Sequence, residues 1–162
     1  MARCLLIGCG CRGVELAGLL REDGHAIRGT TRDPARIGPL NDVGVEAVLA
    51  DPDRIATVAA ALDHVVIACI LLGSAAGPAE SLAALHTSRL EMLLTRMVDS
   101  TVRGIVYEAR GTVDHALLDG GAARVTAVSE DSQIPYALLE ADPGDHTAWA
   151  AAARDTVAAL LA

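Results

Sequence analysis

The sequence predicts a three-layer α/β/α fold built on a doubly wound, parallel sheet of about six strands. Short apolar segments alternate with longer helical segments along the whole chain. This alternation is typical of parallel strands joined by right-handed helical crossovers. Apolar residues make up 52% of the chain and aromatic residues only 2%, so the core must be mainly Ala, Val, Leu and Ile. Such a core suits strands that are buried on both faces.

The 162 residues are expected to form a single domain, because no linker, repeat or low-complexity tract divides them. The expected strands are residues 3–7, 25–30, 45–50, 64–72, 102–109 and 135–141. The expected helices are residues 14–20, 34–41, 51–62, 79–99 and 146–161, with a further helical region at 112–132. That region is interpreted as two helices separated at Gly120-Gly121, and a strand over 124–128 is the alternative.

The first strand runs into a glycine loop and then a helix. Gly8, Gly10 and Gly13 have the spacing of the dinucleotide-binding fingerprint. In that fingerprint the glycines permit a tight turn, the approach of a pyrophosphate, and close packing of the helix on the strand. The helix also turns the positive end of its dipole toward the loop, where an anion is stabilised. The order of these three elements therefore predicts a nucleotide site at residues 8–13.

The second strand ends at Thr30-Thr31-Arg32-Asp33-Pro34, in the region where such domains select their nucleotide. NAD-preferring domains place an acidic residue there to bind the ribose 2′-hydroxyl. Arg32 instead offers a guanidinium suited to a 2′-phosphate, with Thr30 or Thr31 as a second donor, so NADP is favoured over NAD. Asp33 is expected to cap the turn that begins at Pro34. The alternative is that Arg32 is a solvated loop residue.

Methyltransferases that use S-adenosylmethionine begin with a similar strand, glycine loop and helix. They typically carry one acidic residue just before the glycines and another at the end of the second strand. This chain has Leu6-Ile7 and Thr30-Thr31 at those places, so methyl transfer is the more distant alternative.

The net charge of −8 argues against a nucleic-acid partner, because the surface as a whole repels polyanions. No segment is long and apolar enough for a membrane span or a secretory signal. Four cysteines are too few for a disulfide framework, and a cytoplasmic protein is expected. Cys9 and Cys11 flank the start of a helix, which could lower a thiol pKa and create a redox sensor. The favoured interpretation is that they are small residues filling a tight loop, and no metal site is expected.

Several of these motifs together resemble the NAD(P)-binding half of atypical or extended short-chain dehydrogenase/reductase proteins, including epimerase- and dehydratase-like members. They are the glycine fingerprint, Gly24-His25 at the start of a strand, Thr30–Pro34, Gly44-Val45-Glu46 and Ala50-Asp51. The resemblance covers residues 1 to about 111, and 112–162 more loosely. It implies a Rossmann-like fold that binds NADP(H).

By this likeness the glycine loop with Arg12 would contact the pyrophosphate, and Arg32 the 2′-phosphate. Asp51 and Pro52 would lie at the adenine, and the segment from Cys69 to Leu72 would lie toward the nicotinamide ribose. The residues expected to contact the cofactor are Gly8, Cys9, Gly10, Cys11, Arg12, Gly13, Thr30, Thr31, Arg32, Asp51, Pro52, Cys69 and Leu71.

The catalytic pair of this family is a tyrosine followed four positions later by a lysine. The chain contains no lysine, so neither Tyr107 nor Tyr136 has that partner, and the catalytic residues stay unknown. Glu108 ends the fifth strand and could act as an acid if it were desolvated. The favoured interpretation is that Glu108 and Arg110 merely hydrate the strand end.

Two functions remain open from the sequence. One is a small NADPH-dependent oxidoreductase acting on a small molecule, with its substrate pocket completed by a second subunit. The other is a non-catalytic NADP(H)-binding sensor or partner protein. In either case the helix 79–99 would offer an apolar face for a homodimer.

Overall fold

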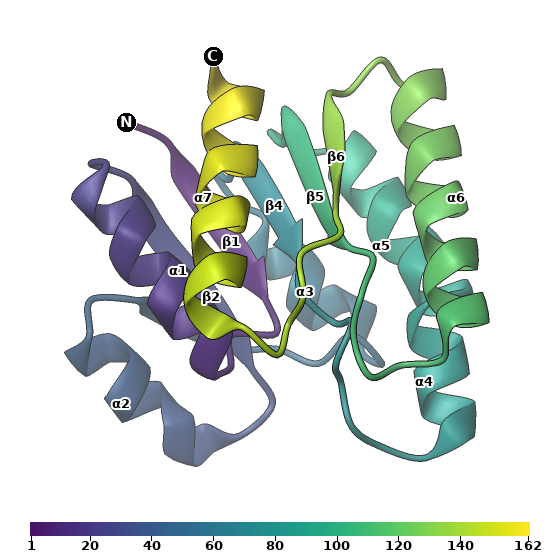
Figure 1. The fold of residues 1–162 in the computed structure, drawn as a ribbon, viewed down its shortest axis with the longest axis horizontal. Coiled ribbons are helices and arrows are strands. Elements are labelled where there is room, and N and C mark those ends of the chain that lie inside the picture. The colour runs from purple at the N-terminus through teal and green to yellow at the C-terminus, as the bar shows by residue number, and fades with distance from the viewer.

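The sheet of the computed structural model, which describes residues 1–162, has the strand order β3-β2-β1-β4-β5-β6 (Figure 1). The strands are β1 (Arg3–Ile7), β2 (Ala26–Thr31), β3 (Glu46–Leu49), β4 (Ile67–Ile70), β5 (Gly104–Glu108) and β6 (Tyr136–Leu139). Every neighbouring pair is parallel. The strand order reverses between β1 and β4, which is the switch point where open α/β sheets bind ligands.

Helices cover both faces of the sheet (Figure 1). They are α1 (Cys11–Glu22), α2 (Ile37–Asp42) after a short 3-10 turn η1 (Pro34–Arg36), α3 (Ile55–Ala61), α4 (Ala79–Leu85), α5 (Ser88–Val98), α6 (His115–Asp131) and α7 (His146–Leu161). None of them combines the length and the apolar character needed to cross a bilayer.

Alternate residues of β1 enter different halves of the core, as the period of a strand requires. Leu6 packs with α1 and α7 on one face, in a cluster that includes Trp149. Leu5 and Ile7 pack on the opposite face with α3, α5 and α6. The central strands are therefore buried on both sides, which confirms the predicted fold class.

The single helix predicted over 79–99 is wrong, because the chain breaks at His86 into α4 and α5. His86 is buried, and its ring nitrogens contact the Tyr107 hydroxyl at 2.6 Å and the Leu72 carbonyl at 3.0 Å. These contacts hold the break against β4 and β5. The apolar side of α5, including Leu93 and Met97, is buried in the chain's own core, so it is not free for a homodimer.

The break predicted at Gly120-Gly121 is also wrong, as is the alternative strand over 124–128. α6 runs without interruption over this region. A Cβ added at Gly121 would collide with the Tyr107 hydroxyl of β5. The glycine therefore lets the helix approach the sheet closely, and it does not end the helix.

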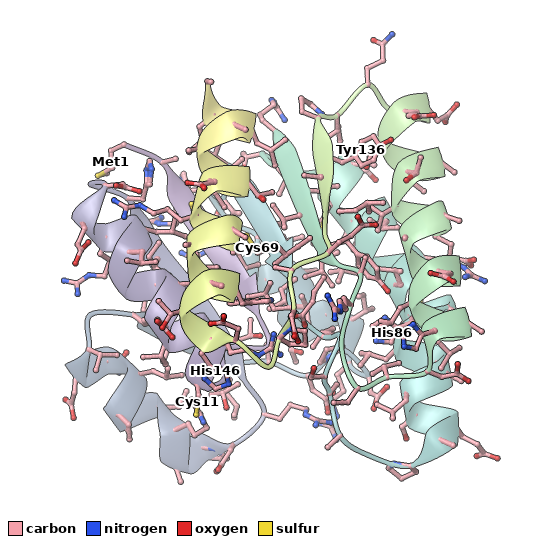
Figure 2. All side chains as sticks on the ribbon, viewed as in Figure 1. Met1, Cys11, Cys69, His86, Tyr136 and His146 are labelled. Atoms are coloured by element: carbon pink, nitrogen blue, oxygen red, sulfur yellow. The ribbon has the colours of Figure 1, made fainter.

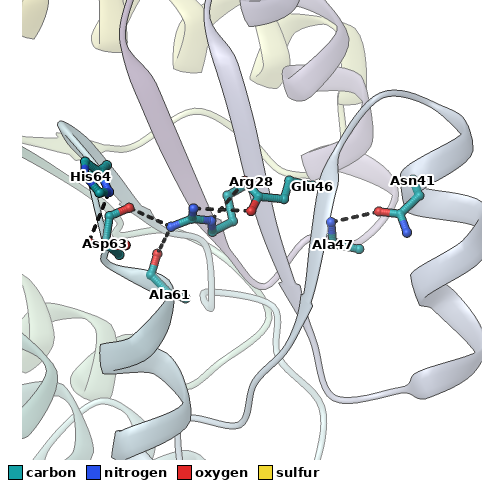
Figure 3. Close-up of polar contacts among 7 residues, drawn as sticks. All are labelled: Arg28, Asn41, Glu46, Ala47, Ala61, Asp63 and His64. Atoms are coloured by element: carbon teal, nitrogen blue, oxygen red, sulfur yellow. Dashed lines mark hydrogen bonds and ion pairs between the residues drawn. The ribbon is translucent and has the colours of Figure 1, made fainter.

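Arg28 connects β2 to the end of α3 (Figure 3). Its side chain is buried and donates to the carbonyl oxygens of Ala61 and Asp63, at 2.6 and 2.8 Å. It also forms an ion pair with Glu46 on β3. A cation at the carbonyl end of a helix satisfies groups that have no partner within the helix. Arg28 therefore stabilises the packing of α3 on the sheet.

Candidate functional site

The glycine loop between β1 and α1 contains one glycine that is tightly packed, Gly8, and one with free space beside it, Gly10. Gly8 has φ +90°, and an added Cβ would lie 2.7 Å from the Leu71 carbonyl oxygen, so only glycine fits there. At Gly10 an added Cβ would meet nothing within 4 Å. The Gly8 N–H donates to Thr30 Oγ1 at 3.2 Å and ties the loop to β2. The loop is thus fixed in shape while its outer surface at Gly10 stays accessible.

A cavity of about 300 Å³ lies against this loop at the carboxyl ends of β1, β2 and β4, and we name it the main cavity. Ten of the thirteen predicted residues line it, namely Gly8, Cys9, Gly10, Arg12, Thr30, Thr31, Arg32, Asp51, Pro52 and Leu71. The residues 74–76 and the helix α4 complete its wall through Ser74, Ala75, Ala76, Ser81, Leu82 and Leu85.

The segment that follows β2 contributes arginines to the main cavity but not its own acidic residue, Asp33. Asp33 is the N-cap of η1, where its Oδ1 accepts the Ala35 N–H at 2.9 Å, as the sequence predicts. Asp33 does not line the cavity, whereas Arg32 does and is exposed. Arg36, which the sequence reasoning missed, also lines it and donates to the Cys9 carbonyl oxygen at 3.0 Å. Its signal was a second arginine one helical turn beyond Arg32.

Asp51 and Pro52 follow β3 and form the opposite wall of the main cavity. The Asp51 carboxylate accepts the Asp53 N–H at 2.9 Å, and its own N–H donates to Thr57 Oγ1 at 2.9 Å. These bonds fix the turn that leads into α3.

A second hollow of about 130 Å³, the small cavity, lies over the start of α1. It is lined by Gly8, Gly10, Cys11, Arg12, Gly13, Leu71, His146 and Trp149. Cys11 and His146 lie at the same end of α1 and α7 (Figure 2). Arg12 lines both cavities, as do Gly8, Gly10 and Leu71.

Arg12 is held by partners that are distant in the sequence. It forms an ion pair with Glu108 at the end of β5, and its guanidinium lies 4.7 Å from the centre of the Trp149 ring. Glu108 is fully buried, and its Oε1 also accepts the Gly73 N–H at 2.8 Å. The interpretation that Glu108 hydrates a strand end is wrong. Trp149 is buried in the core and also lines the small cavity.

Three of the four cysteines, Cys4, Cys9 and Cys69, are buried, and Cys11 is exposed. Cys69 is fully buried in β4 and lines neither cavity, although it is among the predicted contacts. Burial raises the pKa of Cys9 to about 11, opposite to the lowering that a redox sensor requires. The Cys9 thiol packs beside Gly13 and Gly29, which supports the small-residue interpretation.

Neither tyrosine is free to donate a proton in the cavities. The buried Tyr107 hydroxyl is engaged by His86, and burial raises the Tyr107 pKa. Tyr136 donates to Glu130 at 2.9 Å on the surface. No group of three His, Cys, Asp or Glu side chains is placed to hold a metal ion.

No family model matches the chain, and no curated protein matches it in sequence. Solved structures do match its fold. A short-chain dehydrogenase/reductase superfamily protein from Agrobacterium tumefaciens with bound NAD matches with a TM-score of 0.71 at 16% identity, over 85% of this chain and 48% of that one. Citrobacter sp. triphenylmethane reductase complexed with NADP(H) matches with a TM-score of 0.63 at 21% identity, over 85% and 48%. Vestitone reductase from alfalfa matches with a TM-score of 0.65 at 17% identity, over 85% and 56%.

The chain therefore has a doubly wound Rossmann fold. More narrowly, its fold is similar to that of the short-chain dehydrogenase/reductase superfamily protein and the two reductases above, in line with the sequence resemblance. The chain spans about half the length of the solved structures that it matches.

Proposed function

We propose that the protein binds NADP(H) across the glycine loop, with the adenosine half in the main cavity. The observation that carries this proposal is the open surface of Gly10 inside a cavity that is lined by Arg32 and Arg36 and not by Asp33. The start of α1 favours an anion, because helix N-termini present unpaired N–H groups and a positive dipole end. A diphosphate at Gly10 with the adenosine toward Pro52 satisfies both features.

The preference for NADP over NAD rests on Arg32 and Arg36. A guanidinium binds a phosphate through charge-assisted hydrogen bonds worth about 1.5–3 kcal/mol, which corresponds to a preference of about tenfold to a hundredfold. Asp33 does not oppose this preference, because its carboxylate caps η1 outside the cavity. The Agrobacterium and Citrobacter proteins named above carry NAD and NADP(H), so the fold by itself leaves the choice to these side chains.

We propose further that the protein is a small NADPH-dependent oxidoreductase. This step rests on the reductases among the structural neighbours and on a small cavity beside the glycine loop, on the side of Arg12 away from the adenosine. The substrate pocket would be completed by a second copy, and the homodimer stays a prediction.

A non-catalytic NADP(H)-binding role is the second candidate. It is favoured by the hydrogen bond that occupies the Tyr107 hydroxyl and by the ion pair that occupies Glu108. No proton donor with the family's Tyr-Lys geometry is present, since the chain has no lysine.

Calorimetric titration with NADPH, NADH and S-adenosylmethionine tests the ligand. NADPH should bind at least about tenfold more tightly than NADH, and tight binding of S-adenosylmethionine alone would revive the methyltransferase. Oxidation of NADPH is then followed at 340 nm across a panel of carbonyl and imine compounds. Turnover above background supports the oxidoreductase, whereas tight binding without turnover supports the sensor.

A further inference from the structure

The two cavities share part of their lining, including Arg12, which forms an ion pair with Glu108. Arg12 lines both cavities, and only 18% of its side chain is exposed. Its partner Glu108 is fully buried and is fixed from behind by the Gly73 N–H. A dinucleotide that extends from the main cavity into the small cavity therefore lies beside Arg12.

The small cavity gathers donors that suit an anion. The first N–H groups of a helix have no partner within the helix. At the start of α1 no side chain caps them either. Trp149 is 1% exposed, lines this cavity, and its indole Nε1 has no hydrogen-bond partner. The guanidinium of Arg12 adds a full positive charge. A fully buried carboxylate, Glu108, at present neutralises that charge.

We propose that Glu108 is a specificity-determining residue that competes with a ligand diphosphate for Arg12. The proposal rests on the proposed nucleotide binding and goes beyond it. In the free protein the Glu108 carboxylate stands in for a phosphate on the guanidinium. When a diphosphate reaches α1, Arg12 exchanges the carboxylate for phosphate oxygens, and Glu108 keeps its bond from the Gly73 N–H.

The exchange selects for the chemical class of the ligand. Opening a buried ion pair opposes binding, because only the fraction of molecules with Arg12 released is competent for the ligand. A diphosphate can replace the carboxylate with several charged oxygens. A nucleotide whose only phosphate is held by Arg32 and Arg36 has no second phosphate to offer, and Arg12 then stays with Glu108. Glu108 therefore weakens the binding of every ligand that must displace it from Arg12, and it leaves the binding of other ligands unchanged.

The test titrates the wild type, Glu108→Gln, Arg12→Gln and the double variant with NADP⁺, inorganic pyrophosphate and 2′-AMP. Gln keeps an acceptor for the Gly73 N–H and removes the charge. Glu108→Gln should tighten the binding of NADP⁺ and pyrophosphate by at least about tenfold, whereas Arg12→Gln should weaken it by about tenfold or more. The binding of 2′-AMP should change in neither variant. The double variant should lose most of the gain, because the competition needs both residues.

Trp149 gives an independent signal, because it is the only tryptophan in the chain and Arg12 lies over its ring. Pyrophosphate should change its fluorescence, and 2′-AMP should not. Thermal unfolding checks that each variant is folded. If Glu108→Gln does not fold, Glu108→Asp serves instead, since it keeps the charge at a shorter reach and should tighten binding less.

The outcomes separate this inference from the proposed function. If NADP⁺ binds the wild type but binds Glu108→Gln equally or more weakly, Glu108 merely positions Arg12, and the competition is overturned. If no protein binds NADP⁺ while Glu108→Gln binds pyrophosphate more tightly, the proposed function fails and the competition stands. If pyrophosphate leaves the Trp149 fluorescence unchanged in every protein, Arg12 does not move and the inference is overturned.

Discussion

The main cavity and the small cavity share the glycine loop, but their arginines are in different states. At the main cavity Arg32 is exposed, and Arg36 donates to a nearby backbone carbonyl. At the small cavity Arg12 is paired with the buried Glu108 and packed on Trp149. One end presents charge to the solvent, and the other end has its charge neutralised by the protein.

The difference suits the exposed arginine to the proposed binding and the paired arginine to stability. An exposed guanidinium contributes little to folding and keeps its donors for a ligand. A guanidinium paired with a buried carboxylate is needed by the fold. If the guanidinium is removed, the carboxylate stays buried and water cannot solvate its charge. Substitutions at the two ends should therefore separate the loss of stability from the loss of binding.

Arg12→Met should have the largest effect and should act on stability. It leaves the buried Glu108 without its cation, which typically costs about 3–5 kcal/mol. Urea unfolding followed by circular dichroism measures the loss. The matched variant Arg32→Met removes the same charge at the exposed end and should change stability by less than about 0.5 kcal/mol. Equal losses in both variants would contradict the contrast between the cavities.

Gly10→Val should affect binding without affecting the fold. The new side chain enters open space in the free protein, but it fills the surface on which the diphosphate is proposed to lie. We expect NADP⁺ affinity to fall by about a hundredfold, or about 2.7 kcal/mol, in a calorimetric titration. Gly18→Val is the control, since this glycine lies on the exposed side of α1 away from both cavities. Unchanged affinity in Gly10→Val would show that no ligand lies over Gly10.

Arg32→Ala should weaken NADP⁺ by about tenfold, or about 1.4 kcal/mol, and leave NAD⁺ nearly unchanged. The reason is that only NADP⁺ carries a 2′-phosphate for this guanidinium. Arg103→Ala removes an exposed arginine outside the main cavity and controls for the change in net charge. Equal losses for both nucleotides in Arg32→Ala would show that Arg32 does not recognise the 2′-phosphate.

The smallest expected effect is a dependence of stability on pH through His86, which supports β5 and the Leu72 carbonyl from behind. Burial lowers the His86 pKa below the value of 6.5 that the unfolded chain has. Below pH 6.5 the unfolded chain therefore binds a proton that the folded chain does not, and stability falls as the pH falls. The slope from this residue cannot exceed about 1.4 kcal/mol per pH unit.

Urea unfolding at pH 7.5 and 5.5 measures this dependence, and His86→Gln should reduce it. Asp23 does not contribute to the difference in stability between pH 7.5 and 5.5. Its pKa is lowered from 3.8 by Arg154, so the stability that it contributes is lost only at more acidic pH. An unchanged dependence in His86→Gln would assign the effect to other groups.

The fold and the main cavity follow from short stretches of sequence. Gly8, Gly10 and Gly13 lie within six consecutive residues, 8–13, and the residues Thr30 to Asp33 lie at the end of one strand. Their positions in space follow from local structure, because parallel strands bring their carboxyl ends to one edge of the sheet. The capping role of Asp33 was predictable for the same reason, since its acceptor serves an N–H two residues away.

The small cavity could not be predicted in this way. Arg12 and Glu108 are separated by 96 positions, and nothing in either local segment indicates the other. The break at His86 depends on a hydroxyl group 21 positions away, and Gly121 is understood only from its contact with the same tyrosine. Each of these pairs forms only when α1, α6 and the break between α4 and α5 pack against β5.

The sequence by itself thus determined three features: the alternation of strands and helices, the glycine turn, and the arginine that follows β2. Spacing along the chain is enough for these, because each depends on local geometry. The tertiary structure decided which arginine is free and which is neutralised. Burial and pairing are properties of the packed core, where a single carboxylate from another strand changes what a charged side chain can do.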